Sequence, residues 1–175
     1  NSAVSVHERK FLRQMYNAGL ASYDNVAIGV HPFGWGNPPD VICCDPFAAR
    51  DWDDQPQFFF LNTVATYNEI AKSYGHNTEL WLTEFGWSTW NDLPLDPPEP
   101  WMNYLTTDEQ ISNTIRAFEI GQSLDYVGPM FLWNFNFANE FNINNRDEMV
   151  GYSLVIADEN SNFQPRALYE ALSGS

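Results

Sequence analysis

Basic residues are scarce in this sequence of 175 residues. Only 8 Lys and Arg stand against 23 Asp and Glu, which gives a formal net charge of −15 at pH 7. Nucleic acids and anionic membranes are bound mainly through Lys and Arg side chains that displace counterions from phosphates. We therefore expect neither a nucleic-acid partner nor a membrane partner, and we favour a neutral or cationic ligand.

Cysteines are few, and long apolar runs and glycine-rich phosphate motifs are missing. The two cysteines, Cys43 and Cys44, are adjacent, so they cannot cross-link distant segments or supply the spaced pairs of a structural zinc site. We expect two free thiols in a loop, with a vicinal disulfide as the alternative. No segment approaches the roughly 20 apolar residues that span a bilayer. Neither Gly-x-Gly-x-x-Gly nor Gly-x-x-x-x-Gly-Lys occurs, so nothing indicates a dinucleotide or nucleoside triphosphate site.

The composition is that of a folded protein. Hydrophobic residues make up 44% and aromatic residues 16% of the chain, which supports a packed core. We expect residues 1–175 to form a single domain.

The hydrophobic pattern alternates between helical and strand-like segments. Apolar residues three or four positions apart predict helices over 6–16 and 60–74, a third helix opened by a capping box at 107–110, and a last one over 165–172. Apolar runs predict strands at 25–32, 79–85 and 127–135, the first of them buried on both faces. Long loops follow the strands, and this order is typical of a parallel α/β sheet, either doubly wound or part of a barrel.

Polar side chains stand at the predicted C-terminal ends of the three strands, where parallel barrels hold catalytic groups. Glu84 lies in the segment Trp-Leu-Thr-Glu-Phe-Gly-Trp, and a carboxylate fixed there can act as nucleophile or base in glycosidic cleavage. A solvated carboxylate is the alternative. His31 is expected to reach a sugar hydroxyl or orient Glu84, and Asn134 to donate to a hydroxyl or carboxylate.

Tryptophans are placed to bind sugar rings. Trp133 ends the third strand, where its indole would form an apolar floor for a pyranose, with core packing as the alternative. Trp35, Trp87, Trp90 and Trp101 lie in the long loops, and stacking on sugar faces would account for them. Small hydrophobic clusters within the loops are the alternative, expected for at least two of these four.

No metal site is expected. The acidic residues Asp45, Asp51, Asp53 and Asp54 lack the Asp-x-Asp-x-Asp-Gly spacing of a calcium loop. They are interpreted as a solvated acidic rim.

Three segments resemble, in order and spacing, the last three strands of retaining glycoside hydrolases of clan A, including bacterial members. They are His-Pro-Phe-Gly-Trp at 31–35, Trp-Leu-Thr-Glu-Phe-Gly-Trp at 81–87 and Gly-Pro-Met-Phe-Leu-Trp-Asn at 128–134. Segments 11–20, 116–121 and 165–172 also look like this family, so the resemblance covers nearly the whole chain. It implies the last three strand–helix units of a (β/α)8 TIM barrel, with long loops on the catalytic face.

The resemblance also implies roles for single residues. Glu84 would be the nucleophile, with His31 assisting it. Together with the residues at the strand ends and in the loops, the resemblance leads us to expect that the carbohydrate substrate is contacted, without any cofactor, by Trp133, Asn134, Trp87, Trp35 and Phe33.

Two departures from the family pattern matter. Phe33 stands where many members have a tyrosine, so a hydroxyl near the nucleophile is missing. The family's acid/base belongs to an Asn-Glu pair after the fourth strand, whereas the Asn-Glu pairs here are Asn68-Glu69 and Asn139-Glu140. A barrel also needs about 250 residues. We therefore expect the acid/base to come from an N-terminal barrel segment or a homo-oligomeric copy, with Glu140 as a hypothetical substitute.

Two other functions stay open at this point. One is a non-catalytic carbohydrate-binding module that keeps the aromatic platform, and the other is a truncated, inactive barrel fragment. We expect a secreted or extracytoplasmic protein, with a cytoplasmic location as the alternative.

Overall fold

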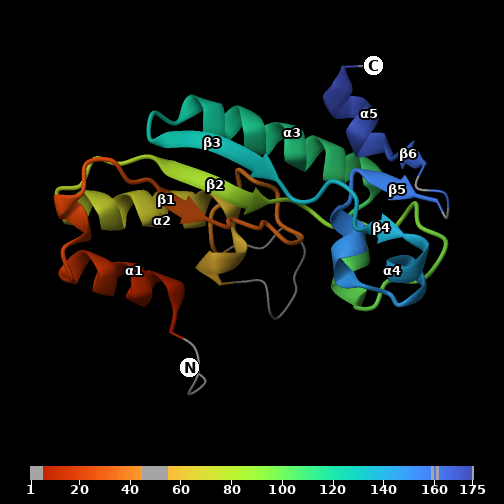
Figure 1. Cartoon of the computed structure of the whole chain (residues 1–175), viewed down its shortest axis with the longest axis horizontal. Coiled ribbons are helices and arrows are strands. Elements are labelled where there is room, and N and C mark those ends of the chain that lie inside the picture. Colours follow the sequence, from red (N-terminus) through yellow and green to blue (C-terminus); the bar gives the residue numbers. More distant parts are fainter. Residues whose placement is uncertain (1–5, 45–54, 159, 161, 175) are drawn as a thin grey trace.

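A three-stranded parallel sheet forms the centre of the fold (Figure 1). The computed structural model describes residues 6–44, 55–158, 160 and 162–174. The strands are β1 (Ile28–Val30), β2 (Leu80–Phe85) and β3 (Val127–Leu132), and they lie in the order β1-β2-β3. This confirms the predicted mixed α/β class with a parallel sheet.

Two helices pack against the sheet and a third packs against one of them, and all three lie close to their predicted positions. They are α1 (Glu8–Asn17), α2 (Phe60–Ser73) and α3 (Thr107–Ser123). In chain order α2 connects β1 to β2, and α3 connects β2 to β3. Gly75 follows α2 with φ +70°, a left-handed conformation that glycine adopts without strain.

The capping box of α3 lies one residue earlier than predicted. Thr106 is the N-cap, and its hydroxyl accepts a hydrogen bond of 3.2 Å from the Glu109 backbone N–H. The Glu109 carboxylate in turn accepts one of 2.8 Å from the Thr106 backbone N–H. A carboxylate at this position also stabilises the positive end of the helix dipole, which favours Glu109 over Gln110 as the reciprocal partner.

The helices cover only one face of the sheet. Ile28, Leu80 and Leu82 point to the helices and are buried in the main core. On the opposite face Trp81 is 40% and Phe131 is 52% exposed. The first strand is therefore not buried on both faces as predicted: its middle residue, Gly29, is exposed between the buried Ile28 and Val30, and no described element covers that face.

The region after β3 is more ordered than the loop that the sequence predicts. β3 ends at Leu132 instead of Phe135, and short elements follow: β4 (Ala138–Asn139), α4 (Glu140–Asn144), the 3-10 helix η4 (Glu148–Tyr152), β5 (Val155–Ala157) and β6 (Phe163–Pro165). β4 pairs with β5 in parallel, and β5 pairs with β6 in antiparallel orientation. Pro165 belongs to β6, so α5 (Ala167–Ser173) begins later than predicted.

A buried arginine attaches this C-terminal region to the loop after β2. The Arg166 side chain is 2% exposed and lies 2.6 Å from Asp92. Its guanidinium also donates to the backbone carbonyls of Thr89, Val150, Gly151 and Ser153. These bonds fix η4 in place, and η4 carries part of the site described below.

Cys43 and Cys44 are joined in a disulfide, so the expectation of two free thiols is wrong. The turn brings both Sγ atoms within bonding distance, and the Cys43 backbone N–H donates to the Asn62 side chain at 2.7 Å. The acidic run at Asp45, Asp51, Asp53 and Asp54 lies outside the described residues. Within the described ranges, no helix has the length and apolar character needed to cross a bilayer.

Candidate functional site

The ends of β2 and β3 bring Glu84 and Trp133 together. Trp133 N–H donates to the Phe85 carbonyl at 2.8 Å, so the two strand ends lie directly side by side. Gly86 allows this approach, because a Cβ at that position would lie 2.7 Å from the Trp133 carbonyl oxygen. The strand-end placement predicted for Glu84 is therefore present, with an indole beside it.

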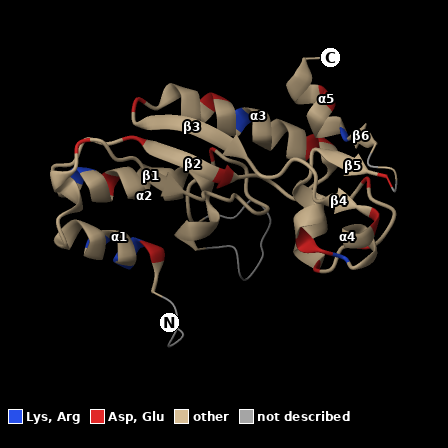
Figure 2. Cartoon of the chain, viewed as in Figure 1, with Lys and Arg blue, Asp and Glu red and all other residues tan. Residues whose placement is uncertain are grey.

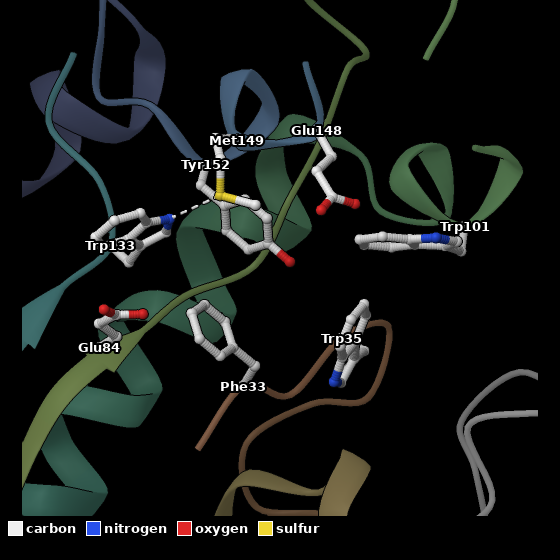
Figure 3. A pocket seen from close by; sticks show the side chains of 8 residues that line it. All are labelled: Phe33, Trp35, Glu84, Trp101, Trp133, Glu148, Met149 and Tyr152. Carbon is white, nitrogen blue, oxygen red and sulfur yellow. Dashed lines mark hydrogen bonds between the residues drawn. The ribbon is translucent and has the colours of Figure 1, made fainter. Parts of the chain in front are cut away.

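A cavity of about 170 Å³ opens next to Glu84 (Figure 3). Its lining is mostly aromatic and comes from all three long loops and from η4: Phe33, Trp35, Glu84, Trp101, Trp133, Glu148, Met149 and Tyr152. Among the described residues, two carboxylates and no cation line it. Figure 2 shows that much of the positive charge lies on α1, which carries Arg9, Lys10 and Arg13. The cavity therefore suits a neutral ligand with an apolar face better than an anion.

His31 lies beside the Glu84 carboxylate, as expected. Its Nδ1 atom is 3.4 Å from Glu84 Oε2, and both side chains remain accessible to solvent. His31 does not line the aromatic cavity, and its ring borders a neighbouring hollow that also includes Gln57 and Tyr67. Its position allows it to orient Glu84 without contacting the cavity's contents.

Trp133 and Phe33 form opposite parts of the cavity wall. The Trp133 indole N–H points to the Met149 sulfur at 3.4 Å, and the ring packs at 5.5 Å from Phe137. Phe33 contacts Tyr152 edge to face at 5.6 Å. Trp133 therefore presents an indole held by contacts on two sides.

The four loop tryptophans divide into two pairs. Trp35 and Trp101 line the cavity and meet edge to face with ring centroids 4.6 Å apart. Trp87 and Trp90 are 1% and 2% exposed and belong to the cores. The predicted contact of Trp87 with a sugar thus has no geometric basis, whereas the alternative of local clusters for two of the four holds.

Trp87 instead supports the loop that carries Trp35. Its indole N–H donates to the Asn37 carbonyl at 2.9 Å, and a Cβ on Gly34 would lie 2.5 Å from its ring. Above it, Trp35 adopts a left-handed backbone conformation with φ +54°, which costs a bulky residue of order 1–3 kcal/mol. The turn at Trp35, the buried indole of Trp87 and the absence of a Cβ on Gly34 together hold the Trp35 ring toward the cavity.

Asn134 is buried and used within the protein. Its amide donates to the Met149 carbonyl at 2.8 Å, and its oxygen accepts a hydrogen bond of 2.7 Å from the Ser153 hydroxyl. In this arrangement Asn134 fixes the segment containing η4, and its amide is not directed at a ligand. The predicted substrate contact is replaced by a positioning role.

Sequence reasoning missed three residues of the cavity, all from η4: Glu148, Met149 and Tyr152. Their contribution depends on the short elements after β3 and on Arg166, which carry no periodic signal. Tyr152 is 5% exposed, and burial, followed by the negative charge of Glu148, raises the pKa of its hydroxyl above its usual range. The hydroxyl therefore stays protonated at neutral pH.

The Asn-Glu pairs do not reach the cavity. Glu140 begins α4 and Glu69 lies within α2, and neither residue lines the cavity beside Glu84. Among residues 6–44, 55–158, 160 and 162–174, no three His, Cys, Asp or Glu side chains gather closely enough to hold a metal ion.

Comparisons of the chain with models of known protein families, with curated proteins and with solved structures gave no match.

Proposed function

We propose that the chain forms part of a glycoside hydrolase that cleaves an O-glycosidic bond with retention, and that Glu84 is its nucleophile. The observation that carries the proposal is the position of Glu84 at the end of a parallel strand, on a cavity walled by aromatic rings whose described lining residues include no cation. Sugars combine apolar ring faces with neutral hydroxyl groups, and such a wall matches both features. In this proposal the sheet is the last three units of a partial (β/α)8 barrel.

The chemistry follows from a carboxylate held rigidly beside a ring-binding surface. Glu84 Oε attacks the anomeric carbon while the bond from that carbon to the leaving oxygen breaks. The leaving oxygen takes a proton from a general acid, and water then hydrolyses the glycosyl ester on Glu84. His31, 3.4 Å from the Glu84 carboxylate, orients it, and the Trp133 indole packs on the sugar ring.

The general acid is proposed to come from outside the described residues. Retention needs two carboxyl groups about 5 Å apart. Glu148 shares the cavity with Glu84, but Figure 3 places it at the opposite end, with Phe33 and Tyr152 between the two carboxylates. Glu148 is therefore not assigned as the acid.

The open face of the central sheet supports an incoming segment. Trp81 and Phe131 are exposed there, and the outer edges of β1 and β3 have no strand partner among the described residues. Apolar faces and unpaired strand edges favour association. An N-terminal barrel segment is the favoured occupant, and a homo-oligomeric copy of the chain is the other candidate, which native mass distinguishes.

The test is hydrolysis of a panel of 2,4-dinitrophenyl β-glycosides, whose leaving groups need little protonation. The parent chain should release dinitrophenol, and Glu84→Gln should lower the rate by at least about 10³-fold because the nucleophile is lost. Glu140→Gln, a carboxylate away from the cavity, is the matched control and should retain the parent rate. Equal rates for the parent and Glu84→Gln would contradict the proposal.

A carbohydrate-binding module without turnover is the second candidate. The Trp35–Trp101 pair favours it, since such a wall binds rings whether or not a reaction follows. It predicts sugar binding that is weakened by Trp101→Ala and unchanged by Glu84→Gln, together with no hydrolysis. Trp87→Ala would not serve as a test, because Trp87 is a core residue.

A secreted or extracytoplasmic location is part of the proposal. The Cys43–Cys44 disulfide supports it, since disulfides persist mainly in oxidising compartments.

A further inference from the structure

We propose that the cavity beside Glu84 contains a separate subsite for a second sugar ring, walled by Trp35 and Trp101 and hydrogen-bonded by the Tyr152 hydroxyl. The preferred ligand is then a disaccharide or longer chain in place of a single sugar. This inference rests on the proposed function for the class of ligand. Its own evidence comes from groups other than the Glu84 carboxylate.

The Tyr152 hydroxyl is the first of these groups. The residue is 95% buried, with an exposed fraction of 5%, and its ring is fixed edge to face against Phe33. Figure 3 shows the phenolic oxygen pointing into the cavity, on the side where Trp35 and Glu148 lie. No hydrogen bond joins this hydroxyl to any residue in the described part of the chain. The hydroxyl is open to the cavity, since it is not among the buried side-chain atoms that lack a hydrogen-bond partner, and a ligand hydroxyl can therefore bond to it.

The Trp35–Trp101 pair is the second group. The two rings come from loops that follow different strands, and they meet with centroids 4.6 Å apart. Trp35 is held there by a left-handed backbone conformation, φ +54°. Strain of this kind is typically retained at positions used for binding. The two indoles give an apolar wall on which the face of a pyranose can pack.

The wall and the hydroxyl define the chemistry of the ligand. Beside the indoles, the polar side chains that line the cavity among the described residues are the Tyr152 hydroxyl and the carboxylates of Glu84 and Glu148. Carboxylates accept hydrogen bonds, and a phenol both donates and accepts. A molecule with an apolar face and several hydroxyl donors fits this set, whereas an anion would meet two like charges.

The order of groups along the cavity gives two ring positions. Glu84 and Trp133 lie at one end, Trp35 and Trp101 at the other, and Phe33 and Tyr152 between them (Figure 3). A ring whose anomeric carbon is at Glu84 packs on Trp133. The ring on Trp35 and Trp101 must therefore be its neighbour in the same sugar chain.

The test is equilibrium binding by isothermal titration calorimetry to the Glu84→Gln chain, in which ligands are not turned over. The probes are cellobiose, laminaribiose, xylobiose and mannobiose, each compared with its own monosaccharide up to about 10 mM. At least one disaccharide should bind about tenfold more tightly than its monosaccharide. Trp101→Ala should remove that advantage and leave monosaccharide binding unchanged.

Tyr152→Phe gives a readout that a merely structural role would not produce. Because the hydroxyl forms no hydrogen bond within the described part of the protein, its removal should leave Tm nearly unchanged, while affinity for the disaccharide falls about tenfold. Trp81→Ala is the matched tryptophan control. Trp81 lies at the start of β2, lines a different hollow and is 40% exposed, so its loss should not change affinity.

Equal affinity for disaccharide and monosaccharide would overturn the inference, and so would undiminished binding in both Trp101→Ala and Tyr152→Phe. Absence of binding to every probe would overturn it as well. These results are separate from failure of the proposed function, which would appear as no hydrolysis by the chain with Glu84 intact. Binding with the expected pattern and without hydrolysis would leave the subsite standing and reject the hydrolase.

Discussion

Replacing Arg166 should disrupt the part of the cavity formed by η4. The guanidinium is almost completely buried and forms a two-point ion pair with Asp92, with nitrogen–oxygen distances of 3.0 and 2.6 Å. It also donates to the carbonyls of Thr89, Val150, Gly151 and Ser153. Arg166→Met removes all of these donors and keeps much of the side-chain volume.

The size of the effect follows from what remains unpaired. Breaking a buried ion pair by removing one partner costs about 3–5 kcal/mol. Two features reduce the cost here: the Asp92 side chain is 31% exposed and regains water, and the Gly151 carbonyl keeps the Gln110 amide as a donor at 3.0 Å. We therefore expect a loss of about 3 kcal/mol, which for a chain of this size lowers Tm by about 6–12 °C.

The assay is thermal and urea unfolding followed by circular dichroism, with two companion variants. Arg166→Lys keeps the charge but cannot reach all partners, so its Tm should fall between those of the parent and Arg166→Met. Arg116→Met removes an exposed ion pair with Asp40 and Glu119 and should shift Tm by about 1 °C or less. If Arg166→Met were no more destabilising than Arg116→Met, the assignment of Arg166 as the attachment of η4 would be refuted.

Three further predictions concern the strand ends and the core. Gly86→Ala should lower activity and Tm together, because its Cβ would lie 2.7 Å from the Trp133 carbonyl and force the strand ends apart; unchanged kinetics would argue against their close approach. Burial raises the pKa of Tyr67 to about 12. The neutral phenol therefore stabilises the folded state fully below pH 10, and this stabilisation is lost as the pH rises to about 12. Tyr67→Phe should make the urea midpoint fall less over that pH range. His31→Gln should lower kcat/KM on aryl glycosides about tenfold through loss of orientation of Glu84, whereas an unaltered value would leave the 3.4 Å contact without function.

The regular part of the fold was predictable because each element has its own periodic signal. α2 repeats apolar residues at helical spacing, and β2 begins with the apolar run Leu80–Leu82 and carries Glu84 next to its last residue, Phe85. Parallel strands place their C-terminal ends at one edge of the sheet, so the proximity of Glu84 to His31 and Trp133 followed from the order of elements. The one-residue error in the capping box arose because Thr106 and Thr107 are both suitable N-caps.

The irregular part was not predictable for a physical reason. β4, β5 and β6 have two or three residues each, which is too short for a pattern to appear. Their positions depend on contacts between residues far apart in sequence, such as the ion pair from Arg166 to Asp92. Tyr152 lines the cavity only because those contacts hold its segment in place.

Trp87 and Trp101 illustrate the same limit at single positions. Both are loop tryptophans that follow Glu84 in the sequence, and the composition of the loop does not distinguish them. Trp87 is a core residue because the turn at Gly34 folds over its ring. Trp101 lines the cavity in contact with Trp35. Whether a loop tryptophan is buried in the core or lines the cavity depends on tertiary packing, which the local sequence does not determine.

The most direct test of the central claim is covalent labelling of Glu84. The parent chain is incubated with 2,4-dinitrophenyl 2-deoxy-2-fluoro-β-glycosides, whose good leaving group does not depend on an acid and whose fluorine slows hydrolysis of the ester. Intact mass and peptide mapping should show one added glycosyl unit on Glu84, and none in Glu84→Gln. A label on another residue, or no label with any sugar of the panel, would contradict Glu84 as the nucleophile.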